Sequence, residues 1–348
     1  MYKSFFIKLL ASTLSILLIL GGFVFVIDPF NHYRADEDLT KIIHHQTYYQ
    51  NVGIAANAQY DTLITGSSMT QNFRADHFDD KTDSVAVRLP FEGGILSDYI
   101  TLIDTAISNN SELKRIYWGL DNYILTSDSQ LNEETNRIPS YLIDENPFSD
   151  VKYLLNKDVL FTYTRTYFGN KFRSDYNFYE MQIWENPSID FSKEAAVNNY
   201  IPPEKSYEHS TNLYDDSVRN LLQVLTQLIE KNPHIEFIFF APPYSILNWH
   251  ATIIAGKLDA HIYALKTTYS KLLEYDNVRF FYFQNIPELI TNLDNYKDAT
   301  HYRSTYNEYM LDCFVSGENE ITKDNYEAVL EDMKRFAKNY DYDTLLNS

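Results

Sequence analysis

Cysteine is almost absent from this sequence, since Cys313 is the one cysteine in 348 residues. An intramolecular disulfide therefore cannot form, and a structural zinc site built from several thiolates is excluded as well. Glycine (10 residues) and proline (11 residues) are also scarce, which excludes collagen-like, disordered and linker-rich architectures. A chain of this length can bury a substantial core, either as two domains or as one large domain with insertions.

Basic residues are in short supply too. Lysine and arginine number 29 against 48 aspartates and glutamates, so the formal net charge is −19. A nucleic-acid binder needs a basic face to neutralise phosphates, and adhesion to anionic lipid headgroups needs the same. The composition therefore argues against nucleic acid as a partner and against electrostatic membrane binding by the folded part of the chain.

One long apolar run is present, and it lies near the N-terminus. Leu9–Ile27 is free of charged residues, is preceded by Lys3 and Lys8, and ends at Asp28. As a helix it would be roughly 28 Å long, close to the thickness of a bilayer core. By the positive-inside rule we expect residues 1–8 to be cytoplasmic and residues 28–348 to be extracytoplasmic. The prediction is a single-pass protein of the cell membrane.

A cleaved signal peptide and a buried soluble helix are the alternatives for this segment. The apolar run is long for a signal peptide, and no clear cleavage site with small residues follows it. No cysteine lies near it, so a lipoprotein anchor is excluded. We therefore expect an uncleaved signal anchor over residues 9–27.

The rest of the chain alternates between predicted strands and predicted helices. Continuous apolar runs predict strands at Asp61–Gly66, Ser84–Leu89, Leu113–Leu120, Ile235–Ala241 and Val278–Phe283. Helical spacing of apolar residues predicts helices ending near Asn57 and over Ile95–Asn109, Asp215–Lys231, Leu247–Tyr275, Arg303–Phe314 and Thr322–Tyr340. This alternation is typical of an α/β fold with a parallel sheet covered on both faces. Residues 126–212 break the pattern, and we interpret them as an insertion over the top of the sheet.

Ligands of open α/β sheets bind at the carboxyl ends of the strands, so the residues that follow each strand are the candidates for chemistry. After the first strand, Gly66 permits a sharp turn, and Ser67 and Ser68 stand where a helix would begin. Free backbone N–H groups at such a helix start suit an oxyanion. The alternative is that a serine here only caps the helix.

The second and third strands are followed by further candidates. Gly93 and Gly94 follow the second strand, where glycine lets a backbone N–H approach a ligand closely or simply forms a turn. Asp121 and Asn122 follow the third strand and should lie near the same edge, as ligand-binding groups or as turn caps.

After the last predicted strand comes the one Asp-x-x-His sequence of the chain, Asp298 to His301. At this spacing the carboxylate can orient the imidazole ring and stabilise its protonated form. The far ring nitrogen can then act as a general base. A nucleophile after the first strand and a base after the last would meet at one edge of the sheet.

Taken in order, "GSS", Gly-Gly, "GLD" and Asp-x-x-His resemble the motif blocks of the SGNH/GDSL hydrolase superfamily. The sequences "DPFNHY", "YDTLITGSSM" and "DATHY" resemble more closely its membrane-anchored, extracytoplasmic bacterial branch, which includes proteins of teichoic-acid D-alanylation and alginate O-acetylation. The resemblance covers residues 28–315 approximately. It implies a three-layer α/β/α sandwich of the flavodoxin-like type, with a five-stranded, mainly parallel sheet preceded by one transmembrane helix.

The resemblance also implies roles for individual residues. Ser68 takes the position of the nucleophile, and Asp298 and His301 complete the triad. The oxyanion donors of the family are the nucleophile's own N–H, a glycine N–H that matches Gly94 (or its neighbour Gly93), and an asparagine side chain. At the asparagine position this chain has Asp121, and a carboxylate donates no hydrogen bond unless it is protonated. Three alternatives remain: Asp121 positions the substrate, Asn122 substitutes as donor, or the oxyanion hole is weaker.

The predicted function is acyl transfer or ester hydrolysis on a cell-envelope polysaccharide or related polymer, through an acyl-enzyme on Ser68. A glycan hydroxyl or water would resolve the acyl-enzyme, and a membrane acyl-donor protein is an expected partner. No metal and no organic cofactor is implied. The alternatives are a catalytically inactive scaffold of the same fold that binds glycan or organises a cell-envelope assembly, and an adhesin-like ectodomain.

Three further features are of lower interest. His44 and His45 are adjacent, so on a helix they point to different faces, which disfavours a metal site. Phe240–Ser245 either lines the pocket or only terminates a strand. The aromatic residues of the insertion either stack on sugars or form an ordinary core; they include Tyr163, Tyr167, Tyr176, Tyr179 and Trp184.

Overall fold

The computed structural model describes residues 2–42, 46–126, 137–144, 146–178 and 188–347. The chain divides into two compact units. The first, which we call the N-terminal unit, comprises residues 1–59, 100–111 and 135–182; the second, the sheet unit, comprises residues 60–99, 112–134 and 183–348. The predicted insertion at 126–212 is therefore divided between the two units.

The N-terminal unit begins with the apolar helix α1, Tyr2–Ile27, which has 26 residues and is long and apolar enough to cross a membrane. It includes the predicted segment 9–27 and starts seven residues earlier, because residues 2–8 contain no proline or glycine that would interrupt a helix. Most of its side chains are exposed, as a helix surrounded by lipid requires. The structure is thus consistent with a single-pass anchor.

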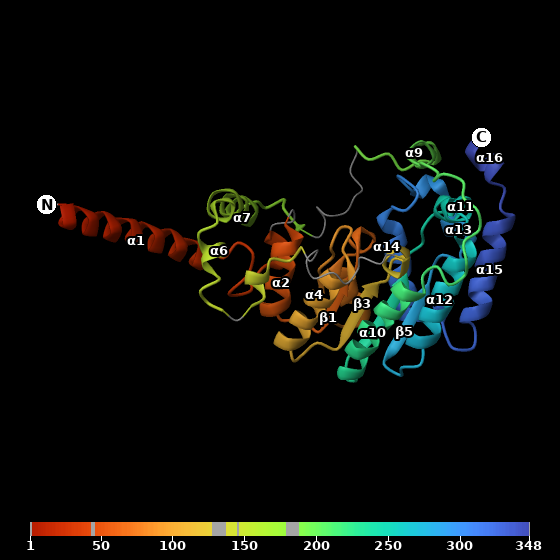
Figure 1. Ribbon diagram of the computed structural model, residues 1–348, viewed down its shortest axis with the longest axis horizontal. Coiled ribbons are helices and arrows are strands. Elements are labelled where there is room, and N and C mark those ends of the chain that lie inside the picture. Colours follow the sequence, from red (N-terminus) through yellow and green to blue (C-terminus); the bar gives the residue numbers. More distant parts are fainter. Residues whose placement is uncertain (1, 43–45, 127–136, 145, 179–187, 348) are drawn as a thin grey trace. The chain divides into compact units, whose positions relative to one another are not determined.

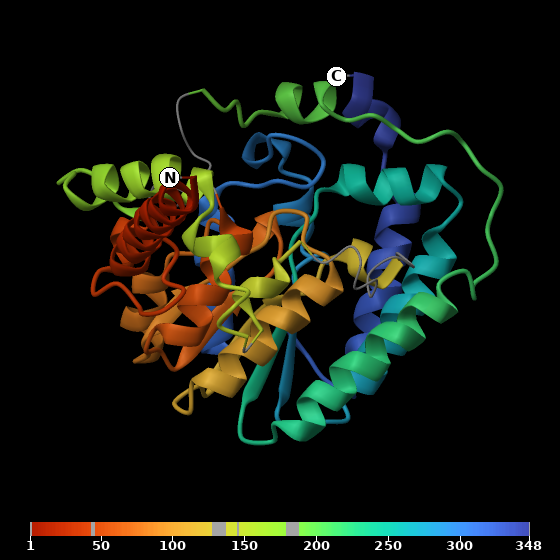
Figure 2. The same cartoon turned by 60° about the vertical axis from the view of Figure 1, so that its left-hand side comes forward.

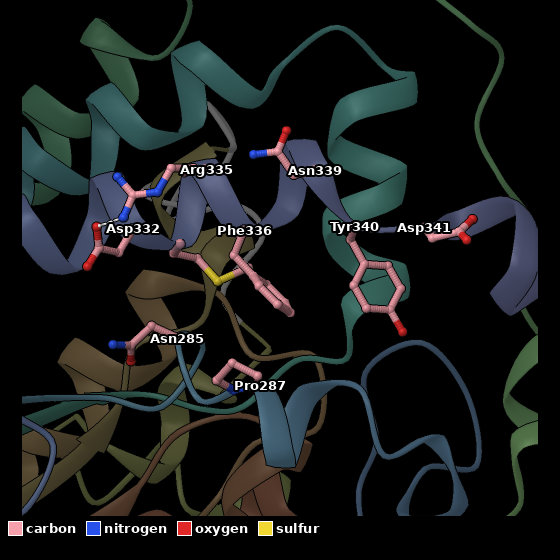
Figure 3. A pocket seen from close by; sticks show the side chains of 9 residues that line it. Asn285, Pro287, Asp332, Arg335, Phe336, Asn339, Tyr340 and Asp341 are labelled. Atoms are coloured by element: carbon pink, nitrogen blue, oxygen red, sulfur yellow. Dashed lines mark hydrogen bonds and ion pairs between the residues drawn. The ribbon is translucent and has the colours of Figure 1, made fainter.

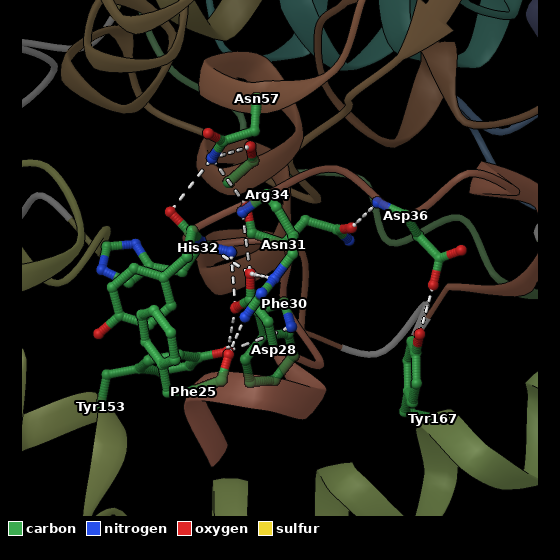
Figure 4. A network of polar contacts seen from close by, with 12 residues as sticks. Phe25, Asp28, Phe30, Asn31, His32, Arg34, Asp36, Asn57, Tyr153 and Tyr167 are labelled. Atoms are coloured by element: carbon green, nitrogen blue, oxygen red, sulfur yellow. Dashed lines mark hydrogen bonds and ion pairs between the residues drawn. The ribbon is translucent and has the colours of Figure 1, made fainter. Parts of the chain in front are cut away.

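The turn that follows α1 is fixed by one buried carboxylate, drawn in Figure 4. Asp28 accepts hydrogen bonds from the backbone N–H groups of His32 (2.9 Å), Tyr33 (2.7 Å) and Arg34 (3.0 Å). It also accepts one from the hydroxyl of Tyr153, at 3.0 Å. Four donors on one carboxylate satisfy the polar groups of a tight turn and tie it to the short helix α6, Val151–Leu154.

These contacts lead to a prediction about processing. Residues 2–27 should remain in the mature protein, because Gly21 and Val24 of α1 are buried and a Cβ at Gly21 would lie 3.6 Å from Leu155. A signal peptide that is removed has no such packing with the mature fold. N-terminal sequencing of protein extracted from membranes with detergent tests this, and a mature chain that begins near Asp28 would contradict it.

The other elements of the N-terminal unit are short. They are η1 (Leu39–Lys41), α2 (Thr47–Asn57), η5 (Ser140–Leu142), the π-helical turn η6 (Asp158–Tyr163) and α7 (Thr164–Lys171). Helix α2 approaches the turn after α1 so closely that a Cβ at Gly53 would lie 2.3 Å from the carbonyl oxygen of Phe30.

The sheet unit is an α/β structure built on a mixed six-stranded sheet with the order β2-β1-β3-β4-β5-β6. Its strands β1, β3 and β5 are labelled in Figure 1. The strands are β1 (Thr62–Thr65), β2 (Ala86–Arg88), β3 (Arg115–Gly119), β4 (Glu236–Ala241), β5 (Val278–Tyr282) and β6 (Glu320–Ile321). The first five pair in parallel, and β6 pairs antiparallel with β5. The expected count of five strands is wrong because β6, with two residues, is too short to show a sequence pattern.

The helices of this unit lie between and after the strands. They are η2 (Ser68–Thr70), α3 (Ala75–Thr82), α4 (Leu96–Asn109), α5 (Asn122–Thr126), α9 (Lys193–Asn198), α10 (Asp215–Lys231), α11 (Ile246–Ile254), α12 (Leu258–Leu272), α13 (Pro287–Ile290), η7 (Leu293–Asn295), α14 (Ser304–Ser316), α15 (Tyr326–Asn339) and α16 (Tyr342–Asn347). The larger part of α4 belongs to the N-terminal unit. Helices α10 and α12 run side by side, as Figure 2 shows.

Alternation along β5 shows that helices cover both faces of the sheet. The ring of Phe281 lies 5.0 Å from that of Phe314 on α14, whereas the ring of the preceding residue, Phe280, lies 4.2 Å from that of Tyr269 on α12. Successive side chains of a strand point to opposite faces, so α14 and α12 pack on opposite sides. All the residues of β5 except Arg279 are buried, as the continuous apolar run predicted.

One predicted helix is wrong. The segment Leu247–Tyr275 forms two helices, α11 and α12, with Gly256 between them at a φ of +64°. A Cβ at this position would lie 2.2 Å from the carbonyl oxygen of Tyr207, and the N–H of His209 donates to the Gly256 carbonyl at 2.8 Å. A distant stretch of backbone thus occupies the break, and helical spacing within 247–275 gives no sign of it.

Candidate active site

Ser67 and Ser68, in the turn after β1, have different roles. Gly66 has a φ of +144°, and a Cβ there would lie 2.6 Å from Thr70 Cγ2, so glycine is needed for the turn. Ser67 is buried, and its hydroxyl oxygen accepts the backbone N–H of Met69 at 3.1 Å. It therefore caps the short helix η2. The capping alternative applies to Ser67, and Ser68 is left as the candidate nucleophile.

Ser68, His301 and Asp298 form a continuous chain of polar contacts. The Oγ of Ser68 lies 3.1 Å from Nε2 of His301, and Nδ1 of the same ring lies 2.7 Å from Oδ2 of Asp298. Ser68 follows the first strand, whereas the other two lie on the loop between η7 and α14. The structure thus brings together the three residues that the spacing and the resemblance singled out, across 233 positions of sequence.

The loop that carries the histidine is held by several hydrogen bonds. The other oxygen of Asp298, Oδ1, accepts the backbone N–H groups of Thr300 and His301, both at 2.8 Å. The residues at the two ends of the loop, Tyr296 and Tyr302, form an antiparallel bridge. One carboxylate therefore shapes the loop with one oxygen and orients the imidazole with the other.

The electrostatics of Asp298 fix the state of the ring. Partial burial acts to raise the pKa of Asp298, but the hydrogen bond and charge of His301 and two backbone N–H groups outweigh it and hold that pKa well below its ordinary value. An ionised carboxylate only accepts hydrogen bonds, so the proton between the two residues belongs to Nδ1 of His301. Nε2 then faces Ser68 as an acceptor, which is the state a general base needs.

The sign of this shift also predicts a pH dependence. A carboxyl group whose pKa is lower in the folded protein stabilises the fold above the ordinary carboxyl pKa, and the contribution is lost as the pH falls through the folded value. The arrangement of Asp298 and His301 should therefore persist throughout the neutral range and fail only in acid.

Gly94 differs from the role that the resemblance implies. Its N–H donates to the carbonyl of Phe91 at 3.0 Å, and its own carbonyl accepts the hydroxyl of Tyr123 at 2.7 Å. A Cβ on Gly94 would lie 2.4 Å from the hydroxyl of Tyr99. The residue therefore fits the turn alternative, with its N–H used inside the turn. Its neighbour Gly93 adopts a φ of +56° in the same turn.

Asn122 is also engaged elsewhere. Its side-chain amide forms a reciprocal pair with the amide of Gln284, with N–O distances of 3.2 and 3.3 Å. Both residues are buried. This pair joins the end of β3 to the end of β5 across the sheet, which is a structural use of the amide.

Asp121 lies at the end of β3 and is fully buried. The hydroxyl of Tyr244 donates to its Oδ1, while its Oδ2 has no hydrogen-bond partner among the described residues. Burial raises the pKa of Asp121 to about 6, against the opposing effects of Tyr244, Ser67 and the charge of His301. A buried carboxyl group with one unsatisfied oxygen is costly unless it is protonated or meets a ligand.

Sequence reasoning missed the contact between Tyr244 and Asp121, although it considered the segment Phe240–Ser245. This segment follows β4, the neighbour of β3, so its residues reach the same edge of the sheet. It also supports the histidine loop, because the hydroxyl of Ser245 donates to the carbonyl of Ala299 at 2.7 Å and the hydroxyl of Tyr296 donates to that of Pro243 at 2.7 Å. The segment does more than terminate a strand.

A cavity of about 420 Å³ adjoins these residues. It shares Tyr244 with Asp121 and Thr300 with the histidine loop, and its lining is Asn122, Tyr123, Thr126, Pro203, Tyr214, Tyr244, Asn248, Ala251, Thr252, Ala255, Lys257, His261 and Thr300. The predicted insertion at 126–212 thus contributes to it through Thr126 and Pro203, near its two ends. A second cavity, of about 570 Å³, lies along α15 at Phe336 and Tyr340 (Figure 3), and none of the candidate site residues lines it.

The remaining candidates belong to the N-terminal unit or lie outside the described residues. In the N-terminal unit, the hydroxyl of Tyr167 donates to Asp36, and that of Tyr176 donates to the carbonyl of Ile42 at 2.8 Å, so both act as core residues. The ring of Tyr163 packs on Phe30 in the same unit. The metal and sugar-stacking candidates that the structure does not describe are His44, His45, Tyr179 and Trp184.

Comparison with known proteins adds little. No family model matches the chain, and no curated protein matches it. The chain is similar to a solved structure from Streptococcus pneumonia, described provisionally as a platelet activating factor, with 8% sequence identity and a TM-score of 0.37 over 84% of this chain and 92% of that one. A similarity this weak indicates neither a shared fold nor a shared function.

Proposed function

We propose that the protein catalyses serine-dependent acyl transfer or ester hydrolysis on a cell-envelope polysaccharide or related polymer. The observation that carries this proposal is the contact chain from Ser68 through His301 to Asp298, at 3.1 and 2.7 Å. These distances lie within hydrogen-bond reach for proton transfer. The resemblance of the motif order to the SGNH/GDSL superfamily supports the same roles, and with them a three-layer α/β/α architecture.

The chemistry follows from the geometry. Oγ of Ser68 attacks the acyl carbon while its proton passes to Nε2 of His301, and Asp298 stabilises the resulting imidazolium. The tetrahedral intermediate collapses as His301 returns the proton to the leaving oxygen, which leaves an ester on Ser68. A hydroxyl of the acceptor, or water, then repeats the sequence in reverse. In each half of the cycle the proton that moves passes through Nε2 of His301.

The acceptor class rests on the location and the charge. An anchor helix would hold the sheet unit beside the cell envelope, with a membrane acyl-donor protein as the source of the acyl group. The net charge of −19 opposes binding of a polyanion such as teichoic acid and favours a neutral polysaccharide. The 420 Å³ cavity beside Thr300, lined by tyrosines, threonines and asparagines, offers both stacking and hydrogen bonds to a sugar.

A serine-reactive phosphonate that mimics an ester tests the proposal. We expect one adduct per molecule of the detergent-purified, full-length protein, located on Ser68 by fragmentation of the labelled peptide. The matched pair of variants is Ser68→Ala and Ser67→Ala. The first should lose the adduct, and the second should keep it while it unfolds at a lower temperature, because loss of a cap costs about 1 kcal/mol.

Two outcomes would overturn this reading. An adduct on Ser67 would exchange the roles of the two serines. A folded protein that forms no adduct would show that the serine is not activated, and the alternative of a non-catalytic glycan-binding scaffold would then replace the enzyme.

A further inference from the structure

Asp121 stands beside the candidate nucleophile by the register of the sheet. Strands β1 and β3 are neighbours, and Thr65 is paired with Trp118. Ser68 and Asp121 each come three residues after this pair, on loops that leave the same edge. The two loops touch, since a Cβ at Gly66 would lie 3.1 Å from the backbone nitrogen of Gly119. The hydroxyl and the backbone N–H of Ser67, next to the nucleophile, also face the Asp121 carboxyl and lower its pKa.

The two oxygens of this carboxyl differ. Oδ1 accepts the hydroxyl of Tyr244, and this contact fixes the plane of the group. Oδ2 is buried and has no hydrogen-bond partner among the residues that the structure describes. A buried polar atom left unsatisfied costs roughly 1–3 kcal/mol, so its retention next to Tyr244, which lines the 420 Å³ cavity, suggests that it meets a ligand.

We propose that Asp121 acts as a neutral carboxylic acid and donates the hydrogen on Oδ2 to the oxyanion that forms when Ser68 attacks the acyl carbon. The proton remains on Asp121 throughout, and the contribution is a hydrogen bond that strengthens as negative charge develops. This inference rests on the proposed function and deepens it by assigning the side-chain donor of the oxyanion hole.

Two of the other candidate donors are used elsewhere. The N–H of Gly94 donates to the Phe91 carbonyl, and the amide of Asn122 pairs with Gln284. Asp121 occupies the position at which the resemblance implies an asparagine, and a protonated carboxyl group offers the same combination of one acceptor and one donor as an amide edge.

The surroundings of Asp121 keep its acid form accessible. Burial raises the pKa of its carboxyl to about 6. The titratable groups that act on it are the hydroxyls of Tyr244 and Tyr302, both with pKa values raised well above the ordinary value by burial, and His301, whose charge lowers the pKa of Asp121. A developing oxyanion next to Oδ2 favours the protonated form further.

The proposal predicts a distinctive pH profile. The rate should fall as the pH rises through the pKa of Asp121, because the ionised carboxylate can no longer donate to the oxyanion. In Asp121→Asn the amide supplies a permanent donor in the same place, so this alkaline fall should disappear.

The experiment measures the second-order rate constant for phosphonate labelling of Ser68 against pH in the full-length protein. The variants are Asp121→Asn, Asp121→Ala and Tyr244→Phe. We expect Asp121→Asn to keep the wild-type maximum and lose the alkaline fall, and Asp121→Ala to lose about 10²–10³-fold. The hydroxyl of Tyr244 lowers the pKa of Asp121, so Tyr244→Phe should move the alkaline fall to higher pH. Infrared difference spectra of wild type minus Asp121→Asn report the protonated carboxyl directly.

The outcomes separate this inference from the proposed function. If wild type labels on Ser68 but Asp121→Asn loses as much rate as Asp121→Ala, the carboxylate form is required and the inference is wrong. An infrared titration that shows Asp121 already ionised in acid leads to the same conclusion. If wild type forms no adduct at any pH, the proposed function itself fails.

Discussion

Replacing His301 by alanine is expected to lower the rate of phosphonate labelling at Ser68, and any ester turnover, by roughly 10⁴–10⁶-fold. His301 is the group whose ring nitrogen lies within hydrogen-bond distance of the Ser68 hydroxyl, at 3.1 Å. Without it the proton of the hydroxyl has no positioned acceptor, and a neutral serine is a weak nucleophile. The rate of labelling is measured at the pH at which the wild type labels fastest, with circular dichroism to show that the variant is folded.

The chain offers a matched control for this variant. His77 also has its Nδ1 at 2.7 Å from a carboxylate oxygen, that of Glu308, and is partly exposed like His301. It lies on α3. The variant His77→Ala removes an imidazole–carboxylate pair of the same kind and should label at the wild-type rate. Free imidazole should restore part of the labelling rate of His301→Ala. It should not change the labelling rate of His77→Ala. A folded His301→Ala protein that labels at the wild-type rate would show that another residue activates the serine.

Local patterns predicted the elements that carry the site. Helix α10 runs over Asp215–Lys231 as its apolar spacing indicated, and β1, β3 and β4 lie within one or two residues of the predicted runs. These elements were predictable because the spacing of apolar residues within each segment marks the face that is buried. The sharp turn at Gly66 was predictable for a similar reason, since only glycine readily adopts its φ of +144°.

The errors arise where distant segments decide the structure. Gly256 ends one helix and starts another because the backbone at Tyr207 passes against it, 49 positions away. Strand β6 forms because its two residues pair with the outer edge of β5. Neither cause is visible within the segment itself, and helical spacing continues across the break.

The candidate oxyanion donors were also hard to assign from sequence, because contacts with distant residues decide the role of each side chain. Sequence placed Asp121 and Asn122 at the correct edge of the sheet but could not say where each points. Their partners, Tyr244 and Gln284, lie 123 and 162 positions further along the chain. Three-dimensional pairing therefore decides which of two adjacent polar residues serves the fold and which is left with an unsatisfied oxygen.

Asp298→Asn is expected to have the second large effect, a loss of roughly 10⁴-fold in labelling rate with little loss of stability. The amide oxygen can keep the two N–H groups of Thr300 and His301 that Oδ1 accepts now, so the loop retains its shape. The amide nitrogen then faces Nδ1 of His301 in place of Oδ2. An amide nitrogen only donates, so Nδ1 must become the acceptor.

The change of hydrogen-bond partner at Nδ1 alters the protonation of Nε2, the other nitrogen of the ring. A neutral imidazole with an unprotonated Nδ1 carries its hydrogen on Nε2, the atom 3.1 Å from the Ser68 hydroxyl. Nε2 can then donate to the serine but cannot remove its proton, so the base is present in the wrong tautomer. Nitrogen-15 chemical shifts of the His301 ring measure the exchange directly. Asp298→Ala is the control, because it also leaves two loop N–H groups without their acceptor and should lower the unfolding temperature as well as the rate. If Asp298→Asn instead labels at the wild-type rate with the tautomer exchanged, proton removal by Nε2 is not what activates Ser68, and the role assigned to His301 is wrong.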